Sequence, residues 1–317
     1  MILRDSEPEK VYVARPESRD VFPRPTGKLT GYLAILAGAF LFGMWATVGK
    51  FALANVPPIT LAWFVQSVTA VAFAPFLGRL RFRRADWARV GVASVLGAVA
   101  APTMYFTGLN LTTPVSAALL SNTEALFTVV FAFVFLRERL SRGGYLAAGA
   151  ILAGAVVVTL DLGQARGDVG SALIGNVLLV LAAMCWGGAN TVGRVVTARH
   201  DIPSFVCMQL SLGSLILAPI VLATGNSLFV PPSGIPIAVF LALGGAALFA
   251  YLFYFSMRKI GALQAGAILA TSAAFGVAIA VAFDFPLTAL QALGGGVMAL
   301  GVVALYRLAS KPSPAKG

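Results

Sequence analysis

Long apolar runs alternate with short polar gaps along most of the chain. A helix needs about 20 mainly apolar residues to cross the hydrocarbon core of a bilayer. Ten runs of about this length follow one another, at residues 30–51, 58–77, 87–108, 114–136, 143–162, 172–194, 203–224, 235–257, 262–284 and 287–306. Turn-forming residues such as Pro57-Pro58 and Gly225-Asn226 lie in the gaps. The pattern predicts an all-α membrane protein with ten transmembrane helices.

A motif in the first run returns in the sixth. Residues 42–50 read FGMWATVGK, and residues 186–194 read WGGANTVGR. Further matches link Ala74-Pro75 to Ala218-Pro219 and Tyr105-Phe106 to Tyr254-Phe255. Each half holds five runs, and an odd number of spans turns the second copy upside down in the membrane. Inverted repeats of this kind are typical of secondary transporters, which bind substrate near the midplane between the halves.

The repeat divides the chain into five parts. We expect a tail at residues 1–28, a first repeat at 29–162, an outside linker at 163–171, a second repeat at 172–306 and a second tail at 307–317. The first tail mixes basic and acidic residues with four prolines and has no apolar core. This composition is typical of a disordered segment and excludes a cleavable signal peptide.

Lysine and arginine positions predict the orientation. If the N-terminus is cytoplasmic, all but two of the 23 basic residues fall in cytoplasmic segments, the exceptions being Lys50 and Arg166. An excess of positive charge in cytoplasmic loops is the general rule for membrane proteins. A missed or extra span would destroy this division. We therefore expect a multi-pass protein of the cell membrane with both termini in the cytoplasm.

Composition supports the membrane interpretation and excludes others. Of the 317 residues, 59% are hydrophobic and only 11% are charged, whereas soluble domains carry about 25% charged residues. The net charge of +11 does not indicate nucleic-acid binding, because the basic residues lie in gaps between apolar runs and no nucleic-acid motif is present. Cys185, Cys207 and the single histidine, His200, lack the spacing of a metal site or a catalytic triad. We expect no metal and no cofactor, and since no ATPase motif occurs, transport driven by gradients.

Two stretches resemble the EamA type of the drug/metabolite transporter superfamily. The first is the aromatic-Gly pair Phe42-Gly43 followed by Lys50, and the second runs from Pro114 to Glu124 and on through residues 127–154. The sequence departs from the family pattern at Ala125 and Arg137, and its second half has Phe283-Asp284-Phe285-Pro286 in place of the loop glutamate. The resemblance covers about residues 30–306. It implies a ten-helix carrier built of two EamA repeats, which exports amino acids, other small metabolites or drugs.

Glu124 is the most informative candidate site residue, because it lies near the middle of the fourth run. A charge at the bilayer centre costs about 2.5–3.5 kcal/mol, so such residues usually face a cavity or a partner. In a functional role, Glu124 contacts an ammonium group of the substrate or binds a proton. In a structural role, it is protonated and forms a hydrogen bond to a neighbouring helix. Asn122, two residues earlier, lies on a different helix face and is a second substrate-binding candidate.

Aromatic residues on the repeated spans are further candidates. Trp45 and Trp186 lie on the first and sixth runs, Asn190 follows Trp186 by one turn, and Tyr105 and Tyr254 are related by the repeat. These side chains could frame a substrate cavity between the halves. The alternative for each aromatic ring is core packing or an interfacial belt.

Lys50 and Arg194 are equivalent in the repeat and end their helices on opposite sides of the membrane. They are candidates for gating residues. The alternative is that each cation is only stabilised by the negative C-terminal end of its helix, or extends its charged group to the membrane–water interface. For Glu138, in the loop before the fifth run, a surface ion pair is the favoured interpretation.

Taken together, the sequence predicts a secondary transporter that exports amino acids or related amine and drug-like compounds by alternating access. Its partners would be the substrate, the lipid bilayer and a coupling proton or other ion, with no nucleic acid, and it would act as a monomer or homodimer. An intramembrane lipid-modifying enzyme or a non-transporting scaffold are the alternatives. Against the enzyme stands the lack of clustered acids, histidines or a nucleophile at membrane depth.

Overall fold

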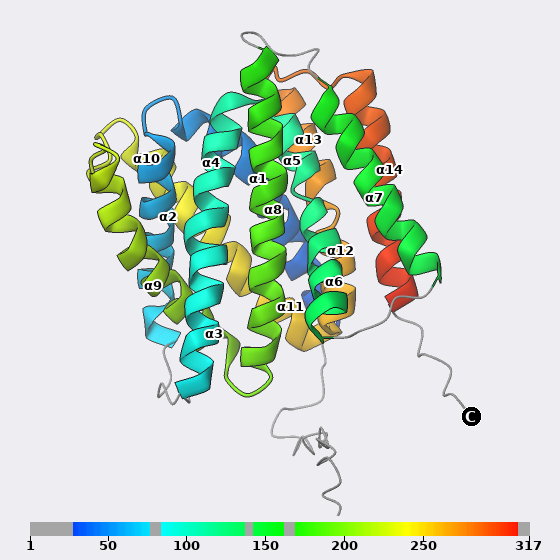
Figure 1. Ribbon diagram of the computed structural model, residues 1–317, viewed down its shortest axis with the longest axis horizontal. Helices are drawn as coiled ribbons and strands as arrows, with labels where there is room; N and C mark the ends of the chain where they lie inside the picture. The colour runs from blue at the N-terminus through cyan, green and yellow to red at the C-terminus, as the bar shows by residue number, and fades with distance from the viewer. Residues whose placement is uncertain (1–27, 77–83, 137–141, 162–168, 310–317) are drawn as a thin grey trace, which may run out of the picture.

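A computed structural model describes residues 28–76, 84–136, 142–161 and 169–309, which form a bundle of helices running roughly along one axis (Figure 1). Residues 1–27 of the first tail, residues 310–317 of the second, most of the outside linker, and Arg166 and Glu138 lie outside the described residues. The predictions about those segments therefore stay predictions.

The expected spans are all present as helices. The first half contains α1 (Lys28–Ala52), α2 (Pro58–Phe73), η1 (Ala74–Phe76), α3 (Arg84–Ser94), η2 (Val95–Ala100), α4 (Ala101–Leu111), α5 (Pro114–Leu120), α6 (Thr123–Leu136) and α7 (Arg142–Leu160). The second half contains α8 (Val169–Thr197), α9 (Ile202–Ala223), α10 (Ile235–Phe240), η3 (Leu241–Leu248), α11 (Phe249–Ile260), α12 (Ala262–Leu269), α13 (Ser272–Ala282) and α14 (Ala289–Ala309). In the described parts of the chain, nine helical stretches are long and apolar enough to cross a membrane, and α2 is a shorter apolar helix. The prediction of an all-α membrane protein with ten spans is confirmed.

Local sequence signals explain several helix ends. Thr113 precedes α5 and its Oγ1 accepts a hydrogen bond of 3.2 Å from the Ser116 amide, while Asp201 caps α9 through the Ser204 amide at 2.9 Å. Both helices have proline in their first turn, where the missing N–H costs nothing. Gly261 ends α11 with a φ of 90°, a conformation that suits glycine.

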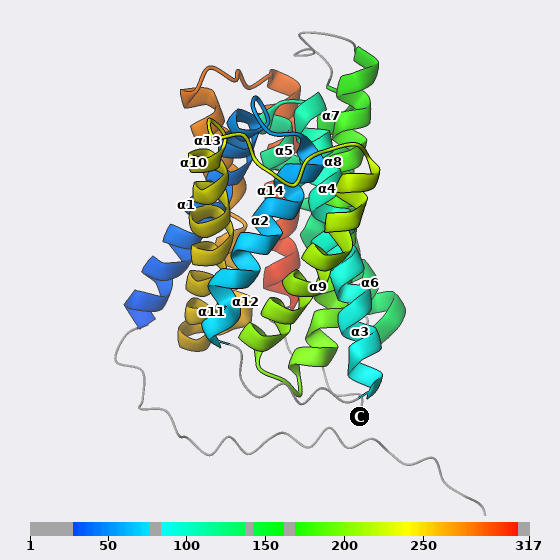
Figure 2. The same cartoon turned by 90° about the vertical axis from the view of Figure 1, so that its left-hand side faces the viewer.

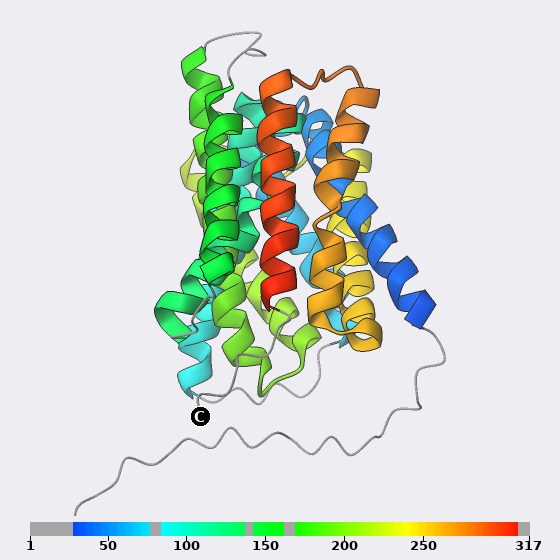
Figure 3. The same cartoon turned by 90° about the vertical axis from the view of Figure 1, so that its right-hand side faces the viewer.

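The first and last helices show which ends of the bundle correspond. α1 begins and α14 ends at the same end (Figures 1 and 3), which we name the termini end, and we name the opposite one the far end. This arrangement requires an even number of crossings. Which end faces the cytoplasm stays a prediction from the basic residues.

The two halves pack with an internal symmetry that matches the sequence repeat. α4 packs on α8 as α11 packs on α1, and α6 packs on α8 as α13 packs on α1. The helices on the symmetry axis pack on their own counterparts: α2 lies beside α9 (Figure 2), and α7 lies beside α14 (Figures 1 and 3). Small residues allow the last contact, because a Cβ on Gly154 would lie only 2.4 Å from the Gly294 carbonyl oxygen.

Two kinds of irregularity recur in both halves. The fourth span is broken between α5 and α6 at Ser121-Asn122, and the ninth between α12 and α13 at Ala270-Thr271. The third and eighth spans each contain a π-helical segment, η2 and η3. Such segments and broken helices often occur at functional sites. The hydrophobic pattern is continuous through all four places, so the sequence did not predict them.

The symmetry between the halves is broken at the two ends of the bundle, where equivalent helices pack to different extents. At the far end α5 packs against both α13 and α1, across the boundary between the halves. At the termini end the symmetry-related contacts of α12 with α6 and α8 are at most marginal among the described residues. The bundle is therefore closed at the far end and more open towards the termini end.

Candidate functional site

A small pocket lies where the two broken spans meet the first and third spans. Its volume is about 10 Å³, roughly the room for one water molecule. Its wall includes Phe42 and Trp45 from α1, Tyr105 from α4, Ser121 after α5, and Ser272 and Ala273 at the start of α13. The pocket thus brings both halves of the chain to one site, as an inverted repeat requires.

Three predicted aromatic residues meet beside this pocket. The ring centroids are 5.6 Å apart for Trp45 and Tyr105, 5.4 Å for Tyr105 and Trp186, and 6.0 Å for Trp45 and Trp186. These distances are those of favourable aromatic pairs. The rings come from α1, α4 and α8, so this aromatic cluster (Trp45, Tyr105, Trp186) joins the halves. The Trp186 indole donates a hydrogen bond of 3.1 Å to the Gly97 carbonyl in η2, which fixes that ring.

Glu124 lies in the first turn of α6, directly after the break. Its carboxylate accepts a hydrogen bond of 2.6 Å from the Asn190 side-chain amide of α8. Asn190 is exposed and follows Trp186 by one turn, so the acidic group continues the face formed by the aromatic cluster. In the described part of the chain no lysine or arginine pairs with Glu124. An uncompensated carboxylate at this depth is suited to bind a cation or a proton.

Tyr306 of α14 adds a polar group near Glu124. The two side chains are close enough to interact electrostatically, and a Cβ on Gly266 of α12 would lie 3.0 Å from the Tyr306 hydroxyl. Tyr306 therefore lies between Glu124 and α12, where the described residues of α6 and α12 have at most marginal contact.

Lys50 holds two helices together at the far end. Its Nζ donates hydrogen bonds to the carbonyl oxygens of Leu109, Asn110 and Thr112, at 2.8, 2.9 and 2.8 Å. Carbonyls at the C-terminus of a helix lack partners within the helix and carry partial negative charge, which favours a cation there. Lys50 thus caps α4 and ties α1 to it. Arg194, its repeat equivalent, is exposed near the end of α8 at the termini end.

Comparison with known proteins agrees with this architecture. The sequence profile described as the EamA-like transporter family matches residues 29–160 and 173–307, one match for each half. The chain belongs to the EamA-like transporter family. It is a membrane transporter of the drug/metabolite transporter superfamily and not an enzyme, as the resemblance implied.

Two curated relatives of this EamA-like transporter match it over most of their length. An uncharacterized transporter of Methanothermobacter thermautotrophicus is 27% identical over 303 residues, covering 88% of this chain and 87% of its own. The pseudopaline exporter CntI of Pseudomonas aeruginosa is 22% identical over 285 residues, covering 88% and 96%. A protein of known crystal structure is similar in fold, with a TM-score of 0.63 at 19% identity over 89% of this chain and 99% of its own.

Two predicted site residues of the EamA-like transporter lie apart from the cluster. Tyr254 is on α11, and among the described residues its ring contacts Phe253, at 5.9 Å, and no member of the aromatic cluster. Asn122 lies in the break after α5, and its side chain has no hydrogen-bond partner in the described part of the chain. Their roles in substrate binding stay predictions.

Several pocket residues were not anticipated from the sequence. Ser272 and Ala273 occupy the ninth span where the repeat places the Ser121–Glu124 region of the fourth. Aligning the two halves at the offset of Tyr105 and Tyr254 would have found them. Phe42 belongs to the repeated motif and to the family resemblance, and neither marks it as a binding residue.

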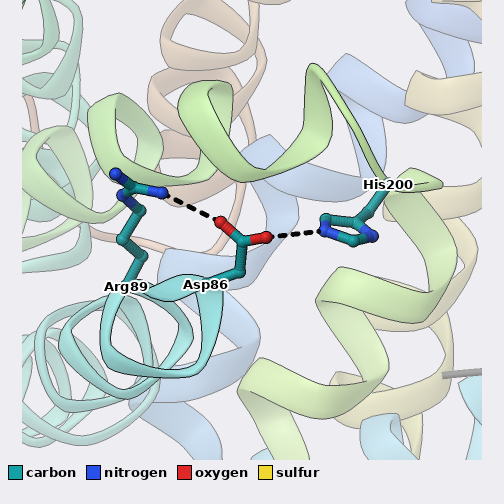
Figure 4. A network of polar contacts seen from close by, with 3 residues as sticks. All are labelled: Asp86, Arg89 and His200. Atoms are coloured by element: carbon teal, nitrogen blue, oxygen red, sulfur yellow. Dashed lines mark hydrogen bonds and ion pairs between the residues drawn. The ribbon is translucent and has the colours of Figure 1, made fainter. Parts of the chain in front are cut away.

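One ion-pair network lies away from the pocket. Asp86 of α3 is buried and bonds Arg89 at 2.9 Å and His200, between α8 and α9, at 3.1 Å (Figure 4). The network ties the first half to the second at the termini end. Among the described residues no group of three His, Cys, Asp or Glu side chains could hold a metal ion.

Proposed function

We propose that the protein exports small amine-bearing compounds, amino acids or related drug-like molecules, across the cell membrane by alternating access. The observation that carries this proposal is the Glu124 carboxylate, held by Asn190 beside the aromatic cluster and without a basic partner in the described part of the chain. Aromatic faces and a carboxylate together are the chemistry that binds an ammonium group. The exporter CntI among the relatives supports the outward direction.

The unequal ends of the bundle support alternating access. In this proposal symmetry-related helices can take two arrangements, a closed one and an open one. Among the described residues α5 packs against α13 and α1 at the far end, whereas the equivalent contacts of α12 at the termini end are at most marginal, which supports the proposal. Exchanging the two arrangements between the halves would open the far end and close the termini end. With cytoplasmic termini, this structure corresponds to the state that receives substrate from the cytoplasm. A proton that competes with the amine for Glu124 would couple export to the proton gradient.

A transport assay tests the proposal. Purified protein would be reconstituted into vesicles with an imposed pH gradient, and a panel of amino acids, alkylamines and aromatic amines would be followed by mass spectrometry. We expect the wild type to transport at least one amine-bearing compound and Glu124→Gln to transport it at least tenfold more slowly. Uptake equal to that of protein-free vesicles for every compound would refute amine transport, and full activity of Glu124→Gln would refute the role of the carboxylate.

A further inference from the structure

Lys50 and Arg194 occupy equivalent places in the two repeats, each in the last turn of the first helix of its repeat. Lys50 caps the last turn of α4, where its Nζ donates to the carbonyls of Leu109 and Asn110 at 2.8 and 2.9 Å. Arg194 is exposed at the opposite end of the bundle. The repeat therefore predicts a counterpart of the Lys50 cap, a bond from Arg194 to the last turn of α11.

The C-terminus of α11 is built like that of α4. At the offset that relates the repeated tyrosines of these two helices, both helices end at equivalent residues. Directly after α4, the Thr112 amide donates to the Gly108 carbonyl at 3.1 Å. Directly after α11, the Gly261 amide donates to the Met257 carbonyl at 3.0 Å, which is the same bond in the second copy. The part of α4 that Lys50 caps thus has a structural equivalent in α11.

The last carbonyls of α11 can accept a cation. By the same offset, the carbonyls of Arg258 and Lys259 correspond to the two α4 carbonyls named above. In the described part of the chain no side chain donates a hydrogen bond to either of them. The Lys259 Nζ lies instead 5.7 Å from the centroid of the Phe255 ring, one turn back along the helix. Carbonyls at the end of a helix lack partners within the helix and favour a positive charge.

Helix packing at the two ends differs in the same way as the caps. α1 contacts α4, whereas contact between α8 and α11, the symmetry-related pair, is at most marginal among the described residues. Both α8 and α11 nevertheless end at the termini end (Figure 1). This is also the end at which the contacts of α12 with α6 and α8 are at most marginal. The Lys50 cap therefore occurs at the closed end, and the equivalent helices at the more open end are apart.

We propose that Arg194 is the capping residue of the termini end: in the state in which that end is closed, its guanidinium bonds the Arg258 and Lys259 carbonyls, and the Lys50 cap on α4 is broken. This inference rests on the proposed alternating access, and it gives each of the two states a cap of its own. A guanidinium presents five donors in a planar fork, so it can bond two neighbouring carbonyls at once. Loss of one cap shifts the equilibrium towards the state that the other cap stabilises.

Distances between spin labels at the two ends of the bundle test this exchange of caps. Labels at Lys28 and Ala198, which are exposed at the termini end, report how far the end of α8 lies from α1, on which α11 packs. Labels at Ala54 and Asn110, which are exposed at the far end, report on that end. Double electron–electron resonance would be recorded on the purified full chain, with both native cysteines replaced by alanine, before and after addition of a transported amine.

Lys50→Met removes the far-end cap, so we expect it to lengthen the far-end distance and to populate a shorter distance between Lys28 and Ala198. Adding Arg194→Met to the same protein should reduce that short population severalfold, whereas Arg194→Lys, which keeps the charge, should retain it. Arg307→Met is the matched control, because it removes an exposed arginine from the last turn of α14 at the same end. Lys50→Gln and Arg194→Gln repeat the comparison if a methionine variant does not fold.

A short population that survives in Arg194→Met, or that Arg307→Met reduces as strongly, would overturn the Arg194 cap and leave the proposed transport cycle standing. A Lys50 variant whose distances equal those of the wild type at both ends would overturn the exchange of caps. Distances that neither a variant nor a transported amine changes would contradict alternating access itself. Amine transport fails by a separate result, if the vesicle assay shows no uptake of any amine.

Discussion

Asn190 in the second half of the chain donates a hydrogen bond of 2.6 Å to Glu124 in the first half. The bond joins α8 to the start of α6, next to the break in the fourth span. In the alternating access that we propose, it would connect units that move relative to each other. A substrate amine bound at Glu124, as we propose, would act on a contact between the two halves and so influence the conformation directly.

Replacement of Glu124 by Gln should abolish most transport and preserve the fold. Gln keeps the shape and can still accept from Asn190, but it removes the charge that an ammonium group needs. We expect at least a tenfold slower transport rate, equivalent to about 1.4 kcal/mol or more. The thermal unfolding temperature of the purified variant serves as the control. Normal transport combined with a lower unfolding temperature would assign Glu124 a structural role.

Removal of the Lys50 amine should loosen the far end. Lys50→Met keeps the length of the side chain but loses three hydrogen bonds to α4 carbonyls. Bonds to charged groups contribute about 1.5–3 kcal/mol each. We expect a longer distance between spin labels at Ala54 and Asn110, which are both exposed at this end, measured by double electron–electron resonance. Lys50→Arg, which keeps the positive charge, is the matched control. An unchanged distance distribution in Lys50→Met would show that the Lys50 hydrogen bonds do not hold α1 and α4 together at the far end.

The sequence predicted the spans and part of the aromatic site, but not the breaks in the helices. Trp45, Tyr105 and Trp186 were candidates because the repeat placed them in a common architecture, and they do meet. Tyr254 was chosen by the same symmetry but lies apart, because the bundle is in an asymmetric state that no sequence pattern can specify. The ten spans could be predicted because the lipid environment selects apolar side chains, which are visible in the sequence. The breaks at Ser121 and Thr271 depend on how neighbouring helices satisfy the backbone, so hydrophobicity did not reveal them.

Glycine at position 43 should be required for the contact between α1 and α13. A Cβ there would lie 2.6 Å from the Ser272 carbonyl oxygen and 2.8 Å from the Gly276 nitrogen, and backbone atoms cannot move aside easily. We expect Gly43→Ala to lower the free energy of unfolding by about 1–3 kcal/mol. Gly149→Ala on α7 is the control, since among the described residues no atom outside its own helical turn lies within 4 Å of the added Cβ. Equal unfolding temperatures for the two variants would contradict the packing.

The buried Asp86 should couple energetically to His200 across the two halves. Their atoms are 3.1 Å apart, and Asp86 is only 2% exposed. A double-mutant cycle with Asp86→Asn and His200→Ala should give an interaction energy of about 0.5–3 kcal/mol in chemical or thermal unfolding. A cycle of Asp86→Asn with Gly149→Ala, which is remote, supplies the additive control. Additivity in the first cycle would mean that the pair does not hold the termini end together.

The orientation of the bundle decides whether the open end faces the cytoplasm. Asn110 and Ser227 are exposed at the far end, where the Ser227 carbonyl accepts a hydrogen bond of 2.8 Å from Thr60 at the start of α2. Arg199 is exposed at the termini end. Because basic residues gather in the segments of the termini end, we expect that end to be cytoplasmic.

Single cysteines at these three positions test the orientation with a membrane-impermeant maleimide. In intact cells, cysteines at positions 110 and 227 should be labelled, and a cysteine at 199 should react only after the membrane is opened. The native Cys185 and Cys207 are buried and would be replaced by alanine to remove background. Labelling of position 199 from outside, with protection of 110 and 227, would reverse the orientation. The more open end of the bundle would then face the exterior, and the structure would represent a state that releases an exported substrate instead of one that receives it.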